Sequence, residues 1–178
     1  MDTTYKMIVS HDKDELIRAI EEKRYTKRLL CKWFRSNNEF ALAFASKFGY
    51  EDFIRSFITD PKWAYKWCKE FGPNEKLEKI ITKKSARWSY HYAIDFNRPD
   101  KMWGGVNEEQ FAVKFAVQFE DYQSWMIQYL HSTRAALEWM NEIGYDPRIR
   151  DIIEKSSRET VEMWNRKYPT HKMEKKNS

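Results

Sequence analysis

The chain has 178 residues, 42% of them hydrophobic and 16% aromatic, which is enough apolar material to fold around a core. Its mean hydropathy of −0.85 and the absence of an apolar run of about 18 residues exclude a membrane-spanning helix. Two cysteines are too few for a disulfide framework, and the first residues lack the apolar stretch of a signal peptide, so we expect a cytoplasmic protein.

The net charge of +5 is concentrated at the two ends of the chain. Residues 1–36 carry 9 Lys/Arg against 6 Asp/Glu, and residues 155–178 carry 7 against 3. The segment between them holds 16 against 18. A protein that coats nucleic acid is expected to be basic along its length, so the charge pattern disfavours that class.

A pattern of aromatic and small residues recurs about every 23 to 25 positions. Its first copy is Phe40, Ala41, Phe44 and Ala45, a spacing that puts one apolar stripe on a helix. The later copies are Trp63, Ala64, Trp67 and Cys68; Trp88, Ser89, Tyr92 and Ala93; Phe111, Ala112, Phe115 and Ala116; and Ala136, Trp139 and Met140. The repetition predicts an all-α protein, a short α-solenoid of helix-pair repeats of about 23–25 residues with capping ends.

The chain begins with a predicted N-terminal cap over residues 1–38. This segment carries cations at three-to-four-residue steps beside an apolar face, at Lys23, Arg24, Lys27, Arg28, Lys32 and Arg35. Such a stripe can meet nucleic-acid phosphates or an acidic protein surface. It can equally be an ordinary solvated face that Glu21 and Glu22 partly neutralise.

Residues 39–154 are predicted as the repeats, each with two short helices. The dipeptides Asp60-Pro61 and Asp146-Pro147 predict helix starts, as do Ser85, Ser132 and the Asn107/Gln110 pair. Gly49, Gly72 and Gly144 predict helix ends.

The third repeat lacks the glycine and carries Gly104-Gly105 in its second helix, which predicts a loop or kink near Trp103. That loop is either an insertion at one edge of the stack or a contact loop with Trp103 as its anchor. Residues 155–171 are predicted as the C-terminal cap, and residues 172–178 as a disordered basic tail.

A second candidate patch consists of Lys83, Lys84, Arg87, Tyr90 and His91. Tyr90 and His91 lie off the apolar stripe, so they either pack against a neighbouring repeat or form an exposed aromatic group among cations. Exposed aromatics of this kind suit base stacking or a protein-binding hot spot.

The segment Asp60–Cys68 resembles the Asp-Pro-x-x-Ala-Tyr-x-Tyr-Ala unit of short helical repeats found in many tailed-phage proteins. Looser copies at 39–45, 87–93 and 110–116 extend the resemblance over residues 39–154. Cys68 departs from the final small residue of that unit. The resemblance implies a virus-encoded helical-repeat protein that acts in the host cell. Small phage proteins of this type commonly bind host factors such as nucleases, defence effectors or the transcription machinery.

Motifs for catalysis or metal binding do not occur in the sequence. The four histidines form no ligand pair on one helix turn, and Cys-x-x-Cys, His-Glu-x-x-His and phosphate-cradling loops are absent. We therefore expect no cofactor, no metal and no enzymatic activity, although residues assembled across repeats could build an active site. The expected function is inhibition or modulation of a host protein, and nucleic-acid binding through the same cations is the alternative. The oligomeric state stays open.

Overall fold

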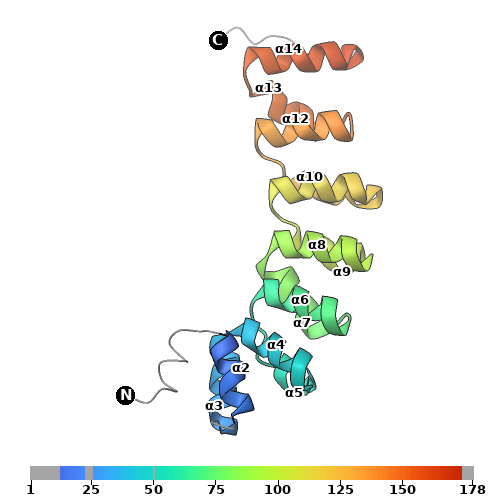
Figure 1. Ribbon diagram of the computed structural model, residues 1–178. Helices are drawn as coiled ribbons and strands as arrows, with labels where there is room; N and C mark the ends of the chain where they lie inside the picture. Colours follow the sequence, from blue (N-terminus) through green and yellow to red (C-terminus); the bar gives the residue numbers. More distant parts are fainter. Residues whose placement is uncertain (1–12, 23–25, 50, 174–178) are drawn as a thin grey trace. The chain divides into compact units, whose positions relative to one another are not determined.

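The computed structural model describes residues 13–22, 26–49 and 51–173, and in this part of the chain every regular element is a helix (Figure 1). The predicted all-α class is therefore confirmed. The chain forms two compact units, Met1–Trp88 and Ser89–Ser178, and helix α8 (Ala86–Phe96) contributes to both. The expectation of one repeat domain over residues 1–171 stays a prediction.

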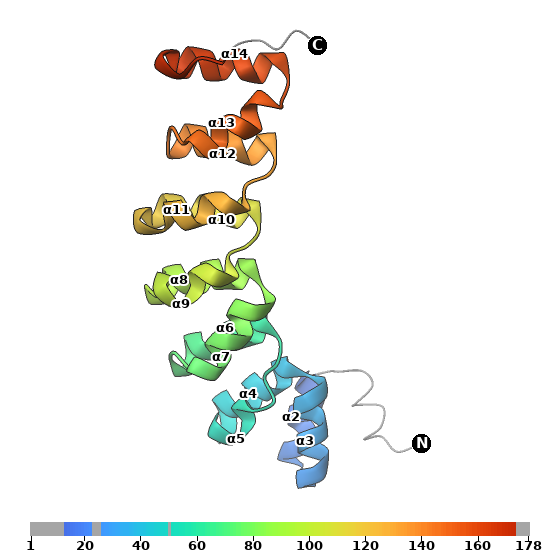
Figure 2. The same cartoon turned by 180° about the vertical axis from the view of Figure 1, so that it is seen from behind.

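Within the first unit, helices pack against their neighbours along the chain. Its elements are α2 (Lys13–Glu21), α3 (Lys27–Ser36), α4 (Asn38–Phe48), α5 (Glu51–Arg55), α6 (Pro61–Phe71), α7 (Glu75–Lys84) and the start of α8. Helix α4 contacts α2, α3, α5 and α6, and α6 pairs with α7 (Figures 1 and 2).

The second unit has the same alternation of longer and shorter helical segments. Its elements after α8 are α9 (Pro99–Met102), η1 (Trp103–Gly105), α10 (Glu109–Gln118), η2 (Glu120–Tyr122), α11 (Gln123–Met126), η3 (Ile127–Tyr129), α12 (Thr133–Glu142), α13 (Pro147–Glu154), α14 (Arg158–Lys167) and η4 (Pro169–His171). Helix α10 contacts α11 and α12, and α13 contacts α12 and α14 (Figure 2).

Side-chain caps fix where most of the longer helices begin. The carboxylate of Asp60 accepts hydrogen bonds from the N–H groups of Lys62 and Trp63, and Ser132 and Asp146 cap α12 and α13. Ser85 Oγ accepts from the N–H of Trp88 at the start of α8. These predicted caps are confirmed.

The predicted cap at Asn107 is wrong. Helix α10 begins one residue later than the capping-box pattern indicates, with Glu108 at the N-cap position. The Glu108 side chain makes no capping hydrogen bond, and its carboxylate instead accepts from the side-chain amide of Gln110.

Buried side chains recur at the positions that the sequence pattern indicates. In the longer helices, one aromatic position is covered in each copy, and its occupants are Phe44, Trp67, Tyr92, Phe115, Trp139 and Trp164. In the shorter helices, one aliphatic position is at most 1% exposed, and its occupants are Ile54, Leu77, Met102, Met126 and Ile149. In four of these pairs, α4–α5, α6–α7, α10–α11 and α12–α13, the shorter helix packs against the longer helix before it.

Aromatic pairs four residues apart close the carboxyl ends of most longer helices. Ring centroids are 4.7 Å apart in Phe44–Phe48 and Trp67–Phe71, 4.3 Å in Tyr92–Phe96 and 4.8 Å in Phe115–Phe119. Residues four apart lie on one helix face, so the second ring extends the buried stripe into the connecting turn.

The turn after α8 reverses the chain without a glycine. Gly49, Gly72 and Gly144 have positive φ angles where other helices end, and Asn97 takes a φ of 50° at the corresponding place. Asparagine tolerates this left-handed conformation better than most residues do. The predicted interruption further on is confirmed, because α9 ends at Met102 and a 3₁₀ turn follows over Trp103–Gly105.

The carboxyl-terminal residues fold back on α14. The indole Nε1 of Trp164 donates to the carbonyl of His171 over 3.0 Å, and the Asn165 side chain bonds both the N–H and the carbonyl of Met173. Met173 is buried at 4% exposure. The described fold thus continues two residues past the predicted end of the cap, and residues 174–178 of the predicted tail lie outside the described residues.

Candidate functional site

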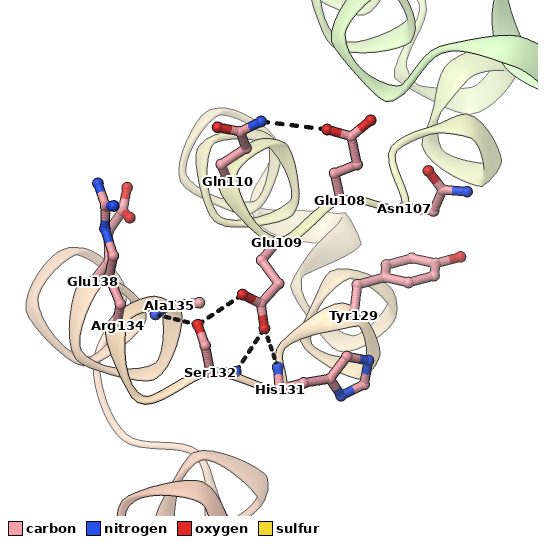
Figure 3. A pocket seen from close by; sticks show the side chains of 10 residues that line it. All are labelled: Asn107, Glu108, Glu109, Gln110, Tyr129, His131, Ser132, Arg134, Ala135 and Glu138. Carbon is pink, nitrogen blue, oxygen red and sulfur yellow. Dashed lines mark hydrogen bonds between the residues drawn. The ribbon is translucent and has the colours of Figure 1, made fainter.

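A hollow of about 460 Å³ lies between the starts of α10 and α12 in the second unit (Figure 3). Its lining is partly polar and partly apolar, and it includes three carboxylates. The lining residues are Asn107, Glu108, Glu109, Gln110, Tyr129, His131, Ser132, Arg134, Ala135 and Glu138.

Glu109 is the best-connected residue of the hollow. One carboxylate oxygen accepts from the backbone N–H groups of His131 and Ser132, and the other accepts from the Ser132 hydroxyl over 2.7 Å (Figure 3). Partial burial alone would raise the pKa of Glu109, but the hydrogen bonds from Ser132 and His131 outweigh burial and hold its pKa below the usual value. The residue therefore stays ionised as an acceptor and is poorly suited to act as a general base.

The first unit contains the same junction with different chemistry. Asn38, like Glu109, is the first residue of a longer helix, and its Oδ1 accepts from the N–H groups of Thr59 and Asp60, each over 3.0 Å. In both units one side chain thus ties the start of a helix to the segment that enters the next longer helix. The recurrence gives Asn38 and Glu109 the same structural role, which is to join consecutive longer helices.

A different kind of surface lies on α6 and the start of α8. The ammonium group of Lys66 lies 4.4 Å from the ring centroid of half-buried Trp63, and that of Lys62 lies 5.1 Å from it. Both lysines are exposed. The contacts are cation–π interactions between helix neighbours, and they fix two positive charges over one indole.

The same arrangement recurs 25 residues later at Trp88. The guanidinium carbon of Arg87 lies 5.1 Å from the ring centroid of Trp88, and the ring of Tyr65 packs against Trp88 at 5.1 Å. We call these residues together the Trp63–Trp88 surface, and its members are Lys62, Trp63, Tyr65, Lys66, Arg87 and Trp88. All of them belong to the first unit.

Lys83 and Lys84, from the predicted second patch, are exposed at the end of α7. The ammonium group of Lys84 donates to the carbonyl of Thr59 over 2.9 Å, directly before the capping residue of α6. The structure thus brings Lys84 close to the helix that carries Trp63. Arg87 lies in the same unit and contacts Trp88.

Tyr90, His91 and Trp103 fall in the second unit. Tyr90 packs against Phe111 at 5.8 Å, as Tyr65 packs against Trp88, and burial raises the pKa of its hydroxyl. Tyr90 is therefore mainly a packing residue, and half-buried His91 lies beside it at 5.5 Å. Trp103 is half-buried, and its ring lies 5.1 Å from that of Trp125.

The predicted N-terminal stripe is a set of exposed cations on α3. The structure describes four of its members, Lys27, Arg28, Lys32 and Arg35, and all four are exposed. Lys23 and Arg24 lie outside the described residues. Glu21, which was expected to neutralise the stripe, forms an ion pair with Lys47 of α4.

The sequence analysis missed Lys62, Lys66 and Trp63 because it assigned Trp63 to the core. A local signal was present, since both lysines lie within one helical turn of the tryptophan. It also missed Trp125, which is 52% exposed and whose contact with Trp103 joins residues of different repeats.

Only the first of the two units has a net positive charge. Residues 1–88 carry 19 Lys/Arg against 13 Asp/Glu, a net charge of +6, whereas residues 89–178 carry 13 against 14, a net charge of −1. The Trp63–Trp88 surface and the α3 stripe both lie in the positive unit.

Comparisons with known proteins identify no relative. A scan against protein-family models, a search of curated proteins and a search of solved structures each return no match. In the described part of the chain, no helix has the length and apolarity needed to cross a bilayer, and no group of three or more His, Cys, Asp or Glu side chains is placed to hold a metal ion.

Proposed function

We propose that this chain is a non-enzymatic binding protein, built as a short α-solenoid, that recognises an acidic surface of a partner protein through the Trp63–Trp88 surface. The observation that carries the proposal is the repeated placement of exposed cations over half-buried tryptophan rings, at Trp63 and Trp88. Tryptophan and arginine are the residue types most enriched at binding hot spots. The Trp88 ring already packs against Tyr65, so binding orders few additional side chains there.

The ring contacts favour a protein partner over nucleic acid. Sequence-independent binding of single strands uses aromatic rings with a face open for a base to stack on. Lys62 and Lys66 both lie over the Trp63 ring, and Tyr65 packs against Trp88, so much of each ring is occupied. The groups that this surface exposes to solvent are mainly the cations over the rings, and these suit carboxylates on a folded partner.

The resemblance of Asp60–Cys68 to tailed-phage repeats supports a more specific proposal. Under it, the chain is phage-encoded, acts in the host cytoplasm, and inhibits or modulates a host protein such as a nuclease, a defence effector or a transcription factor. Its described cysteines, Cys31 and Cys68, are both free thiols, which agrees with a reducing compartment.

Nucleic-acid binding is the second candidate, and the net charge of +6 on residues 1–88 supports it. Exposed lysines and arginines can contact phosphates whether or not a ring is open for stacking. Binding would then be insensitive to sequence and strongly dependent on salt.

Affinity capture with matched charge-reversal variants tests the proposal. We expect tagged protein to retain a specific host protein, and Lys62→Glu/Lys66→Glu to weaken that complex by about 30-fold or more, the loss of one hot spot. The control is Lys76→Glu/Lys79→Glu, two exposed lysines of α7 in the same unit, which should leave affinity within about twofold. Retention of nucleic acid alone, or equal losses in both variants, would overturn the proposal.

A further inference from the structure

An aromatic cluster in the first unit runs from the core to the surface at α5. Phe34 of α3 is 1% exposed and packs against Phe57 at 5.5 Å, and Phe57 packs edge-on against Phe53 at 5.4 Å. Phe53 is 46% exposed. The cluster thus ends in a phenylalanine ring that is held from below and open to solvent.

Two cations of α3 lie over the outer rings of this cluster. The Lys27 ammonium group is 5.8 Å from the ring centroid of Phe53, and the guanidinium carbon of Arg35 is 5.4 Å from that of Phe57. Arg28 and Lys32 are exposed on the same helix. We call Lys27, Arg28, Lys32, Arg35, Phe53 and Phe57 the α3–α5 edge.

Carboxylates lie on the α5 side of this edge and are absent from α3. Helix α3, with the sequence KRLLCKWFRS, contains no acidic residue. On α5, Glu51 and Asp52 are exposed and directly precede Phe53, and Asp52 pairs with Arg55 over 2.9 Å. The edge therefore presents four exposed cations along α3, with Lys27 over the partly exposed ring of Phe53.

We propose that the α3–α5 edge docks a short acidic segment of a partner protein that carries an apolar side chain between its carboxylates. The apolar side chain would lie on Phe53, and the carboxylates would meet Lys27 and the cations along α3. Charge complementarity selects an acidic segment, and the open ring selects one with an apolar side chain over a purely acidic one. The inference rests on the proposed function, because it adds a second contact to a protein-binding role.

Fluorescence anisotropy of labelled peptides tests this docking site. The probes are an Asp/Glu-rich peptide with two leucines, the same peptide with serine in place of leucine, and an oligothymidylate of equal charge. We expect the full-length protein to bind the leucine-containing peptide at least about tenfold more tightly than either other probe. Equal binding of the serine peptide would overturn the role of Phe53, and tighter binding of the oligothymidylate would identify the edge as a phosphate contact instead.

Variants assign the binding to this edge. We expect Phe53→Ser and Lys27→Glu/Arg35→Glu each to weaken peptide binding by at least about tenfold. The matched controls, Val117→Ser for an exposed apolar side chain and Lys76→Glu/Lys79→Glu for exposed cations, should leave it unchanged. A thermal midpoint close to that of the parent protein shows that each variant is folded, and unchanged peptide binding by both edge variants would overturn the inference.

The outcome is separable from that of the proposed function. Lys62→Glu/Lys66→Glu should leave peptide binding at the α3–α5 edge intact while it weakens the complex with the host protein. Loss of peptide binding in that variant, with no effect of Phe53→Ser, would overturn the α3–α5 edge and leave the Trp63–Trp88 surface as the only binding site proposed.

Discussion

A single side chain decides how each junction between repeats responds to pH. Asn38 joins its two partners through a neutral amide, whereas Glu109 joins His131 and Ser132 through a carboxylate. Hydrogen bonds to a charged acceptor are about twice as strong as neutral ones. The junction at Glu109 is therefore the stronger of the two at neutral pH and the one that acid weakens.

Substitution of Glu109 should show this dependence directly. We expect Glu109→Gln to lower the free energy of unfolding by about 1 kcal/mol at neutral pH, because the amide keeps an acceptor but loses the charge. The folded-state pKa of Glu109 is lowered, so its contribution is full above the unfolded-state pKa and is lost as pH falls through the folded-state pKa. The difference between parent and variant, measured by urea unfolding, should therefore shrink between about pH 5 and pH 3.

Glu108→Gln is the matched control for that measurement. Glu108 neighbours Glu109 but is exposed, and its carboxylate accepts a hydrogen bond from the side-chain amide of Gln110 over 3.3 Å. A pH-independent difference at Glu109, or an equal effect at Glu108, would contradict the role assigned to the carboxylate.

At the scale of the helix, the sequence predicts starts and ends better than it predicts how each is stabilised. Asp60, Ser132 and Asp146 were identified from the local sequence because a side-chain oxygen at the N-cap is a local signal. At Asp60 and Asp146 the following proline adds a second one. The third repeat was recognised as lacking a glycine in its turn, but the sequence did not show that Asn97 takes the positive φ instead. Helix α10 was misplaced by one residue because Asn107 is a better cap than Glu108, while the fold selects Glu108.

The uncapped start of α10 offers a stabilising substitution. Glu108 has φ −106° and ψ 133°, the extended conformation that capping residues adopt, but its side chain makes no capping bond. We expect Glu108→Ser to raise the free energy of unfolding by about 0.5–1 kcal/mol, because serine can accept a first-turn N–H. Asn107→Ser, measured in the same way, should have little effect. A gain at position 107 and none at 108 would place the helix start where the sequence pattern put it.

At the scale of the whole chain, the periodically spaced buried residues were predictable and the candidate binding surfaces were not. The same buried positions return in every copy, so Trp67, Phe115 and Trp139 could be identified from periodicity. The surfaces depend on contacts that periodicity does not encode. Tyr90 packs against Phe111 of the following longer helix, and Phe53 became a candidate only because α3 places Lys27 over its ring.

The uneven charge of the two units gives a salt dependence that separates the two candidate functions. An acidic protein bound at the Trp63–Trp88 surface meets three fixed cations, Lys62, Lys66 and Arg87, which are partly screened by salt. We expect its affinity to fall by about tenfold or less between about 50 and 200 mM salt, since the apolar contacts are insensitive to salt. A nucleic acid that the protein contacts at six to ten phosphates would lose about 10³–10⁵-fold in affinity over the same range. Measuring the affinity for the captured partner across this range of salt therefore distinguishes a protein partner from a nucleic acid. A loss of a thousandfold or more would reject the protein-binding proposal, because it would show that phosphates carry the binding.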